Sequence, residues 1–268
     1  MIKKMENPDI KVTILGSGTC VPSLRRSSCS VFVETGTQKI ILDAGPGTMR
    51  RLLETGNEIF DITHIIFSHF HPDHTGEFVP FIFANKYPNE NRRKVPLTLI
   101  GGKGFKEFFN CLKNVYGEWI ELSPGIVNIL ELDNKKACTL DFQQFRLDSI
   151  PVNHRPESVA IKITSLNGYS LVYSGDTGFS QNLITLAFNT DLFICESAFP
   201  DNLEVQGHLT PSLAGEIATQ AKVSFLVLTH FYPECDQFDI AKQCRRTYNG
   251  VFVPAEDLMT FELPLDLS

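Results

Sequence analysis

The stretch Ser68-His69-Phe70-His71-Pro72-Asp73-His74-Thr75-Gly76 places three histidines and an aspartate within six residues. It directly follows His64 to Phe67, an apolar run typical of a buried strand. Imidazole nitrogens and a carboxylate oxygen suit a divalent transition metal, and a loop that leaves a strand can point alternate side chains inward. The plain alternative is a solvated histidine-rich loop. We favour a metal site, because further candidate ligands occur downstream.

Those downstream candidates each come at the end of a predicted strand. His154 follows Ser149 to Asn153, Asp176 lies in Tyr173-Ser-Gly-Asp-Thr-Gly, and His230 closes Leu226-Val-Leu-Thr-His. A lone histidine in such a place is as often a core or surface residue as a ligand. Together with residues 68–76, the three complete a set large enough for two metal ions.

Asp43 and His64 are two further polar residues beside these strands. Asp43 lies in Leu42-Asp-Ala-Gly-Pro-Gly-Thr, between a predicted strand and a predicted helix. Its carboxylate is suited either to cap that helix or to hold a metal ligand from outside the coordination sphere. We predict a structural role for His64.

Composition and charge limit the classes of function. The chain has 268 residues, of which 43% are hydrophobic, and this is enough for one large domain over residues 1–268. The net charge is −7, and the longest basic run is Arg92-Arg93-Lys94. No extended basic surface for a nucleic-acid backbone is visible, so a small or locally held substrate is favoured.

The cysteines and the N-terminal segment indicate the compartment. The seven cysteines are scattered and contain no Cys-x-x-Cys pair, which predicts reduced and buried thiols. Residues 1–8 lack the apolar stretch of a signal peptide, and no segment approaches about 18 uninterrupted apolar residues. We expect a cytoplasmic protein with no membrane partner.

Hydrophobic periodicity predicts an α/β fold, an αββα sandwich of two β-sheets with helices on the outer faces. Strands are predicted at 10–15, 30–34, 39–42, 64–67, 97–100, 126–132, 142–150, 158–164, 169–174, 192–195 and 225–228. Helices are predicted at 47–54, 104–114, 212–220 and 239–246. Phe78, Phe81 and Phe83 are expected on a further helix facing the core, and the polar stretch 88–94 is expected as a surface loop.

The ordered set Asp43, His69-x-His71-x-Asp73-His74, His154, Asp176 and His230 resembles the five motifs of the metallo-β-lactamase superfamily. The resemblance covers nearly the whole chain. It implies that His69, His71 and His154 hold one metal, that Asp73, His74 and His230 hold the other, and that Asp176 bridges them. Asp43 would support this set from outside. Zinc is the expected metal, with manganese and iron as alternatives.

A closer resemblance is to the ribonuclease Z-like branch of that superfamily. It rests on Gly45-Pro46-Gly47-Thr48, Tyr173-Ser-Gly-Asp-Thr, Glu196-Ser-Ala-Phe and Gly207-His208-Leu-Thr210. The branch implies that His208 lies over the metals and assists the leaving group. The alternative is that His208 only precedes a helix capped by Thr210.

The sequence also departs from the tRNA-processing enzymes of this branch. Their tRNA-binding arm is inserted between the third and fourth metal motifs, whereas His154 and Asp176 are separated here by a stretch that one two-stranded hairpin fills. A second element, the loop of pattern P-x-K-x-R-N, is only partly matched by Pro22 to Ser27. Arg26 of this loop is a candidate phosphate ligand, or else a plain surface arginine.

These features predict a dinuclear metal-dependent hydrolase. We expect a phosphodiesterase in which a metal-bridging hydroxide, oriented by Asp73, attacks phosphorus while His208 assists the leaving oxygen. The expected substrate is a small molecule or a short oligonucleotide. The alternatives are a ribonuclease Z-type tRNA 3′-end endonuclease, a carboxylic or sulfate ester hydrolase, and a metal-binding protein without turnover. A homodimer is expected only from the resemblance.

Overall fold

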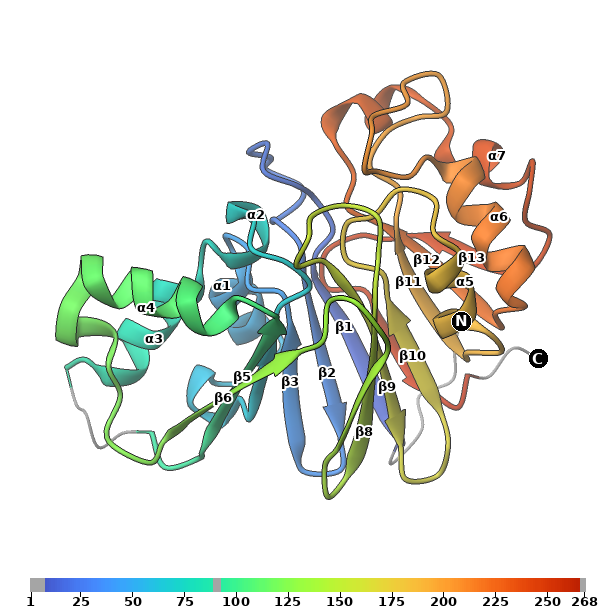
Figure 1. The fold of residues 1–268 in the computed structure, drawn as a ribbon. Helices are drawn as coiled ribbons and strands as arrows, with labels where there is room; N and C mark the ends of the chain where they lie inside the picture. Colours follow the sequence, from blue (N-terminus) through green and yellow to red (C-terminus); the bar gives the residue numbers. More distant parts are fainter. Residues whose placement is uncertain (1–7, 89–92, 266–268) are drawn as a thin grey trace.

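The computed structural model describes residues 8–88 and 93–265. Two seven-stranded sheets form the centre of this described part and face each other in Figure 1. None of the helices within it has the length and apolar character needed to cross a membrane.

The first sheet combines an antiparallel edge with a parallel half. Strands β14, β1, β2 and β3 are antiparallel neighbours, and β3, β4, β5 and β6 run parallel. In sheet order the bounds are β14 (Thr260–Leu263), β1 (Ile10–Gly16), β2 (Ser30–Thr35), β3 (Gln38–Leu42), β4 (His64–Ile66), β5 (Leu97–Gly102) and β6 (Val127–Leu132).

The second sheet has the same division. Strands β10 to β13 run parallel, while β7, β8, β9 and β10 are antiparallel neighbours. In sheet order the bounds are β13 (Val251–Pro254), β12 (Phe225–Thr229), β11 (Leu192–Glu196), β10 (Ser170–Tyr173), β9 (Val159–Ser165), β8 (Phe145–Pro151) and β7 (Cys138–Asp141).

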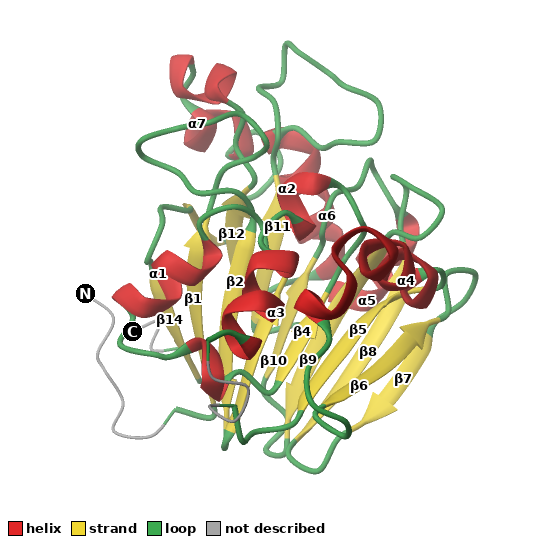
Figure 2. Cartoon of the chain, turned by 90° about the vertical axis from the view of Figure 1, so that its left-hand side faces the viewer, coloured by secondary structure: helices red, strands yellow, loops and turns green. Residues whose placement is uncertain are grey.

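Helices cover the outer face of each sheet (Figures 1 and 2). The first sheet carries α1 (Thr48–Glu54), α3 (Phe78–Lys86) and α4 (Phe105–Tyr116), and the second carries α5 (Gln181–Ala187), α6 (Pro211–Ala221) and α7 (Ile240–Cys244). Short helix α2 (Pro72–Thr75) lies at the site described below. Single 3₁₀ turns span Ile59–Asp61, Gly117–Ile120 and Pro233–Gln237.

The period of two along each strand divides the apolar side chains between three layers. On β2, Val31 and Val33 join the core between the sheets, while Phe32 joins the core under the helices. On β11, Ile194 faces the other sheet and Phe193 faces α6. The predicted αββα architecture is therefore confirmed.

Several local predictions were wrong. Strands β7, β13 and β14 and helix α5 were not predicted, and β8 begins at Phe145 because residues 142–145 form a turn. Phe83 is 40% exposed. Cys20 and Cys111 are exposed as well, whereas Cys29, Cys195, Cys235 and Cys244 are buried as expected.

The expected loop at 88–94 was only partly correct. Residues 89–92 lie outside the described residues. Arg93 is buried, and its guanidinium donates to Asn85 Oδ1 and to the carbonyls of Ile59 and Ile62. Burial lowers the pKa of Arg93 to about 10. This arginine is a structural tie between α3 and the segment before β4.

Candidate metal centre

The candidate ligands lie where strands of both sheets end. His69 and His71 follow β4, and Asp73 and His74 lie on α2, next to the two sheets in Figure 1. From the second sheet, His154 follows β8, Asp176 follows β10, and His230 follows β12. The predicted ligand residues are thus brought together by the fold.

One half of the centre consists of His69, His71, His154 and Asp176, whose ligand atoms all lie within 4.8 Å of one another. His154 Nε2 is 3.2 Å from His71 Nδ1, and Asp176 Oδ2 is 3.7 Å from His69 Nε2. These distances leave room for one ion between nitrogen and carboxylate donors.

The other half is built around the second oxygen of Asp176. Asp176 Oδ1 is 3.2 Å from His74 Nε2 and 3.4 Å from His230 Nε2. Asp73 Oδ2 is 4.0 Å from His74 Nε2. Because its two oxygens face different histidine groups, Asp176 has the position that a bridging carboxylate needs.

Unpaired polar atoms show that this donor set fits divalent metal ions. His69 Nε2, His74 Nε2, His230 Nε2 and Asp176 Oδ1 are buried without a hydrogen-bond partner, an arrangement that costs free energy unless a cation binds there. Burial holds the pKa of His69 well below its ordinary value and lowers the pKa of His230 to about 4. Both imidazoles are therefore neutral at neutral pH, as metal ligation requires.

Asp43 accepts hydrogen bonds from residues 68–76, which we call the histidine loop. Its carboxylate therefore has the position of the supporting role that the sequence suggested. Its Oδ2 accepts hydrogen bonds from His74 Nδ1, Ser68 Oγ and Tyr173 OH, each at 2.7 Å. Its Oδ1 accepts from the Ser68 backbone N–H, also at 2.7 Å. Fixing His74 Nδ1 turns Nε2 toward the centre. Asp43 caps no helix, because the N-cap of α1 is Gly47.

The backbone around the centre is tightly constrained. Asp43 and His230 both adopt left-handed conformations, with φ of 57° and 61°. Such φ values are strained for residues other than glycine and are often found at functional sites. A Cβ on Gly45 would lie 2.1 Å from the Asp73 carbonyl oxygen, so only glycine allows the histidine loop to pack this closely.

His208 lies beside the ligands, as predicted. Its ring centroid is 5.0 Å from that of His154 and 5.8 Å from that of His230. Its Nδ1 is 3.1 Å from Glu196 Oε1. Burial alone would lower the pKa of His208, but the hydrogen bond and charge of Glu196 raise it. His208 Nε2 is left as the ring nitrogen available to a substrate.

Glu196 is a site residue whose role the sequence did not reveal. It ends β11, it is buried, and its carboxylate also accepts from the backbone N–H groups of Thr177 and Leu209. Burial raises its pKa to about 7. The sequence carried two signals for Glu196, its position at the end of an apolar strand and its place in the Glu196-Ser-Ala-Phe motif of the resemblance, but neither showed that it contacts His208.

Arg26 lies at the margin of the centre. Its Nη1 donates to Ser17 Oγ and to the Ala255 carbonyl, each at 2.7 Å, and its guanidinium lies over the Phe231 ring. Arg26 and Asp73 line the same cavity of about 360 Å³. The predicted contact with substrate phosphate stays a prediction.

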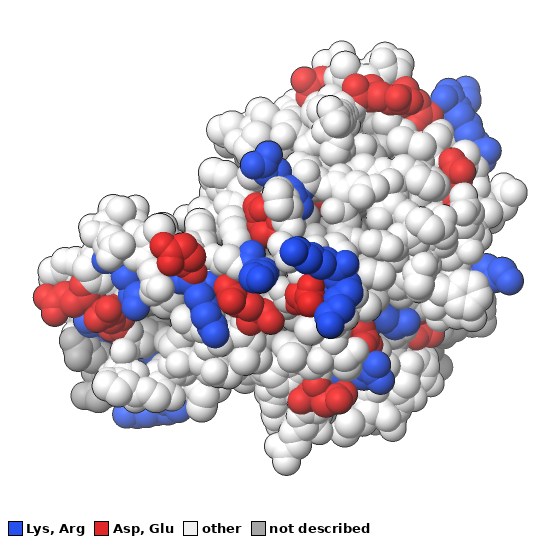
Figure 3. Space-filling model, in the orientation of Figure 1, with Lys and Arg blue, Asp and Glu red and all other residues white. Residues whose placement is uncertain are grey.

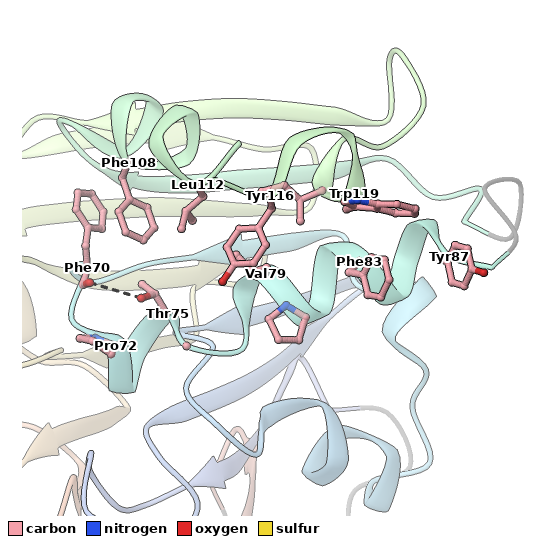
Figure 4. A pocket seen from close by; sticks show the side chains of 13 residues that line it. Phe70, Pro72, Thr75, Val79, Phe83, Tyr87, Phe108, Leu112, Tyr116 and Trp119 are labelled. Carbon is pink, nitrogen blue, oxygen red and sulfur yellow. Dashed lines mark hydrogen bonds between the residues drawn. The ribbon is translucent and has the colours of Figure 1, made fainter. Parts of the chain in front are cut away.

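An apolar groove of about 930 Å³ extends from Phe70 and Thr75 to Tyr87 and Trp119 (Figure 4). Phe70 stacks on Phe108 at one end, and Phe83 stacks on Tyr87 beside Trp119 at the other. The imidazoles of the centre do not line this groove. The groove therefore contributes apolar and aromatic surface next to the centre but no candidate catalytic residue.

A family model described as "Anti-Pycsar protein Apyc1" matches residues 10–246. The chain belongs to this family. It is a metallo-β-lactamase-fold protein of the ribonuclease Z-like branch, as the sequence motifs predicted.

Individual relatives support the same placement. An uncharacterized protein of Mycobacterium tuberculosis is 28% identical over 250 residues, which cover 90% of this chain and 88% of that protein. A ribonuclease Z of Methanosarcina acetivorans is 27% identical over 307 residues, covering 95% of this chain and 98% of that protein. The metallo-β-lactamase fold protein YhfI of Bacillus subtilis has a TM-score of 0.81 at 21% identity, covering 96% of this chain and all of that one.

The segment between His154 and Asp176 agrees with the predicted absence of an arm. It contains only β9 and β10, which pair with each other as an antiparallel hairpin. The alignment with the Methanosarcina ribonuclease Z is longer than this chain, so that protein has residues with no counterpart here.

Proposed function

We propose that this metallohydrolase-fold protein is a dinuclear, zinc-dependent phosphodiesterase acting on a small molecule or a short oligonucleotide. The observation that supports it most is the position of Asp176 between two groups of histidine nitrogens, of which those of His69, His74 and His230 are buried without a hydrogen-bond partner. Two divalent ions held there would supply an activated water at neutral pH and neutralise charge on the phosphoryl group. A cytoplasmic homodimer remains part of the proposal.

The chain's own groups have separate roles in this proposal. Asp73 would help to hold a metal ion and would orient the attacking water, and its Oδ2 lies 4.0 Å from His74 Nε2. Glu196 holds His208 through Nδ1, so that Nε2 can donate a proton to the departing oxygen. Arg26 is proposed to contact the phosphate from the cavity that it shares with Asp73.

The test is hydrolysis of bis-p-nitrophenyl phosphate, compared with p-nitrophenyl acetate and p-nitrophenyl sulfate. We expect turnover of the diester, with losses of about 10²–10⁴-fold in Asp73→Ala and His208→Ala. His64→Phe is the matched control, because His64 is the histidine that lies against Phe142 and Phe145 instead of the centre. The metal content of each variant is measured as well. It shows whether a variant loses activity because it no longer binds metal or because proton transfer is impaired.

Other outcomes point to the alternatives. Turnover of the acetate or sulfate ester alone would mean that the proposed site is catalytic but cleaves a carboxylic or sulfate ester and not a phosphodiester. Cleavage of precursor tRNA at the 3′ side, with salt-sensitive binding, would favour the ribonuclease Z-type activity. Full metal occupancy without turnover of any of these substrates would contradict a catalytic role.

A further inference from the structure

The apolar groove has walls that come from separate parts of the chain. Helix α3 supplies Phe83 to one wall, and α4 and the turn after it supply Tyr116 and Trp119 to the other (Figure 4). The histidine loop forms one end of the groove through Phe70 and Thr75. A partner seated in the groove would therefore also contact the loop that carries candidate metal ligands.

Local contacts hold the two walls at a fixed separation. The Lys86 ammonium donates to the Glu118 carbonyl, which ties the end of α3 to the turn after α4. The Phe83 ring lies edge-on to Trp119, with ring centroids 6.1 Å apart. Phe109 anchors α4 in the core beneath. The groove is therefore preformed, and a partner that binds there does not have to order it.

The aromatic rings of the groove are in contact with water in the single chain. Phe83, Tyr87, Tyr116 and Trp119 are each between 40% and 56% exposed, and Val115 is 76% exposed. Contiguous apolar surface of this kind marks interaction sites on soluble proteins, and Tyr and Trp are frequent anchors of protein interfaces. The groove thus has the composition of a contact surface.

The charges around the groove do not favour a nucleic acid or an anionic membrane as its partner. Lys113 on α4 pairs with Glu121 at 3.8 Å. Figure 3 shows basic and acidic side chains mixed over the left-hand part of the view, where α3 and α4 lie in Figure 1. Nucleic acids and anionic lipid surfaces are bound by an excess of Lys and Arg, so an apolar protein surface is the better match.

A second copy of this chain fits the surface, because the groove and a projecting side chain lie next to each other. Val115 does not line the groove but precedes Tyr116 at the end of α4. In a twofold contact the same patch lies on both copies, so Val115 of each copy can face the groove of the other.

The area of the patch is also in the range that a dimer needs. A buried aromatic side chain contributes about 150–250 Å², so covering the exposed halves of the four rings removes about 400 Å² on each copy. A standard interface buries about 800 Å² on each partner. The remaining groove walls and Val115 add to the area of the rings.

We propose that the apolar groove is the contact surface of a twofold homodimer. The inference deepens the homodimer that belongs to the proposed function, and it rests on that part of the proposed function alone. Because Phe70 and Thr75 lie in the histidine loop, the dimer contact is placed directly beside each candidate metal centre.

The test uses sedimentation velocity on the metal-loaded full chain, together with the fluorescence of Trp119, its single tryptophan. We expect a dimer of about 60 kDa, twice the 30.1 kDa of one chain, at micromolar concentration. Dilution to the monomer should move the Trp119 emission to longer wavelength, because the indole passes from an apolar contact into water. Val115→Glu should weaken the dimer by roughly 100-fold or more, since it places a charge in the contact of each copy.

Leu166→Glu is the matched control, because Leu166 is also 76% exposed but lies in the turn between β9 and β10. This variant should keep the dimer unchanged. Phe83→Glu, on the opposite wall from Tyr116, should weaken the dimer as Val115→Glu does. Circular dichroism verifies that all three variants are folded. A wild type of 30 kDa at these concentrations, or a dimer that both groove variants retain, would overturn the inference.

None of these readouts uses turnover, so the two proposals fail separately. A dimer that does not hydrolyse bis-p-nitrophenyl phosphate would remove the proposed phosphodiesterase and leave the contact surface. A monomer that hydrolyses the diester would remove the contact surface and leave the enzyme. A monomer whose Trp119 emission shifts on addition of phosphatidylglycerol vesicles would assign the groove to lipid, which also contradicts the inference.

Discussion

At the residue scale, the buried carboxylate of Asp43 fixes the orientation of a candidate ligand, His74, without being a candidate ligand itself. Three side-chain donors converge on its Oδ2, and one of them is His74. The left-handed backbone at Asp43 is compensated by these hydrogen bonds. Removing one oxygen leaves at least one of the donors without its acceptor.

We therefore expect Asp43→Asn to bind metal about 10–100-fold more weakly and to remain folded. Titration of the metal-free protein with zinc, followed by calorimetry, measures this. Tyr173→Phe removes a single donor to the same carboxylate and should have a smaller effect. Wild-type affinity in Asp43→Asn would show that the hydrogen bonds to Asp43 do not orient His74.

The candidate ligands could be picked out from the sequence because their chemistry is carried by residue type and order. Asp176 and His230 are recognisable as polar residues that end apolar strands. The motif that contains Tyr173 was recognised but the role of its hydroxyl was not, since a tyrosine in a buried strand usually contributes apolar surface. Its hydroxyl contact with Asp43 depends on how the two sheets are placed, which local sequence does not show.

At the scale of elements, His64 begins β4 and packs edge-on against Phe142 and Phe145 beside β8. Burial lowers its pKa to about 4 from an ordinary value of 6.5. Below pH 6.5 the unfolded chain takes up a proton that the folded chain resists. The stability that neutral His64 contributes is thus complete above pH 6.5 and is lost as pH falls toward 4.

We expect His64→Phe to lessen this loss, since phenylalanine does not titrate. Between pH 7.5 and pH 5, the free energy of unfolding of the wild type should fall by about 2 kcal/mol more than that of the variant. Urea denaturation at both pH values measures the difference. A constant gap between the two proteins would mean that His64 binds its proton equally well in the folded and the unfolded chain.

Long and strongly patterned elements were predicted more accurately than short ones. The runs at 10–15 and 225–228 match β1 and β12 closely, because their alternating or continuous apolar residues are typical of a buried strand. Strands β7 and β13 have four residues each and partly exposed side chains. Their backbones become strands because β8 and β12 offer hydrogen-bonding edges, which is tertiary information.

At the scale of the whole molecule, the candidate metal centre lies where strands of both sheets end. The first sheet supplies His69, His71, Asp73 and His74, and the second supplies His154, Asp176 and His230. The layer order was predictable because two β-rich halves alternate with helices.

Because the ligands come from both sheets, metal ions should stabilise the whole fold and not only a loop. Binding to the folded chain at about a hundredfold excess over Kd contributes about 2.7 kcal/mol for each site. Chelation is therefore expected to lower the melting temperature by about 5–10 °C, measured by calorimetry before and after treatment with chelator. Asp176→Asn should show a smaller shift, because it lacks the carboxylate that faces both halves of the centre. Elemental analysis verifies that the metal has been removed. If the melting temperature of the wild type is then unchanged, the hydrophobic cores stabilise the fold without a contribution from metal ions.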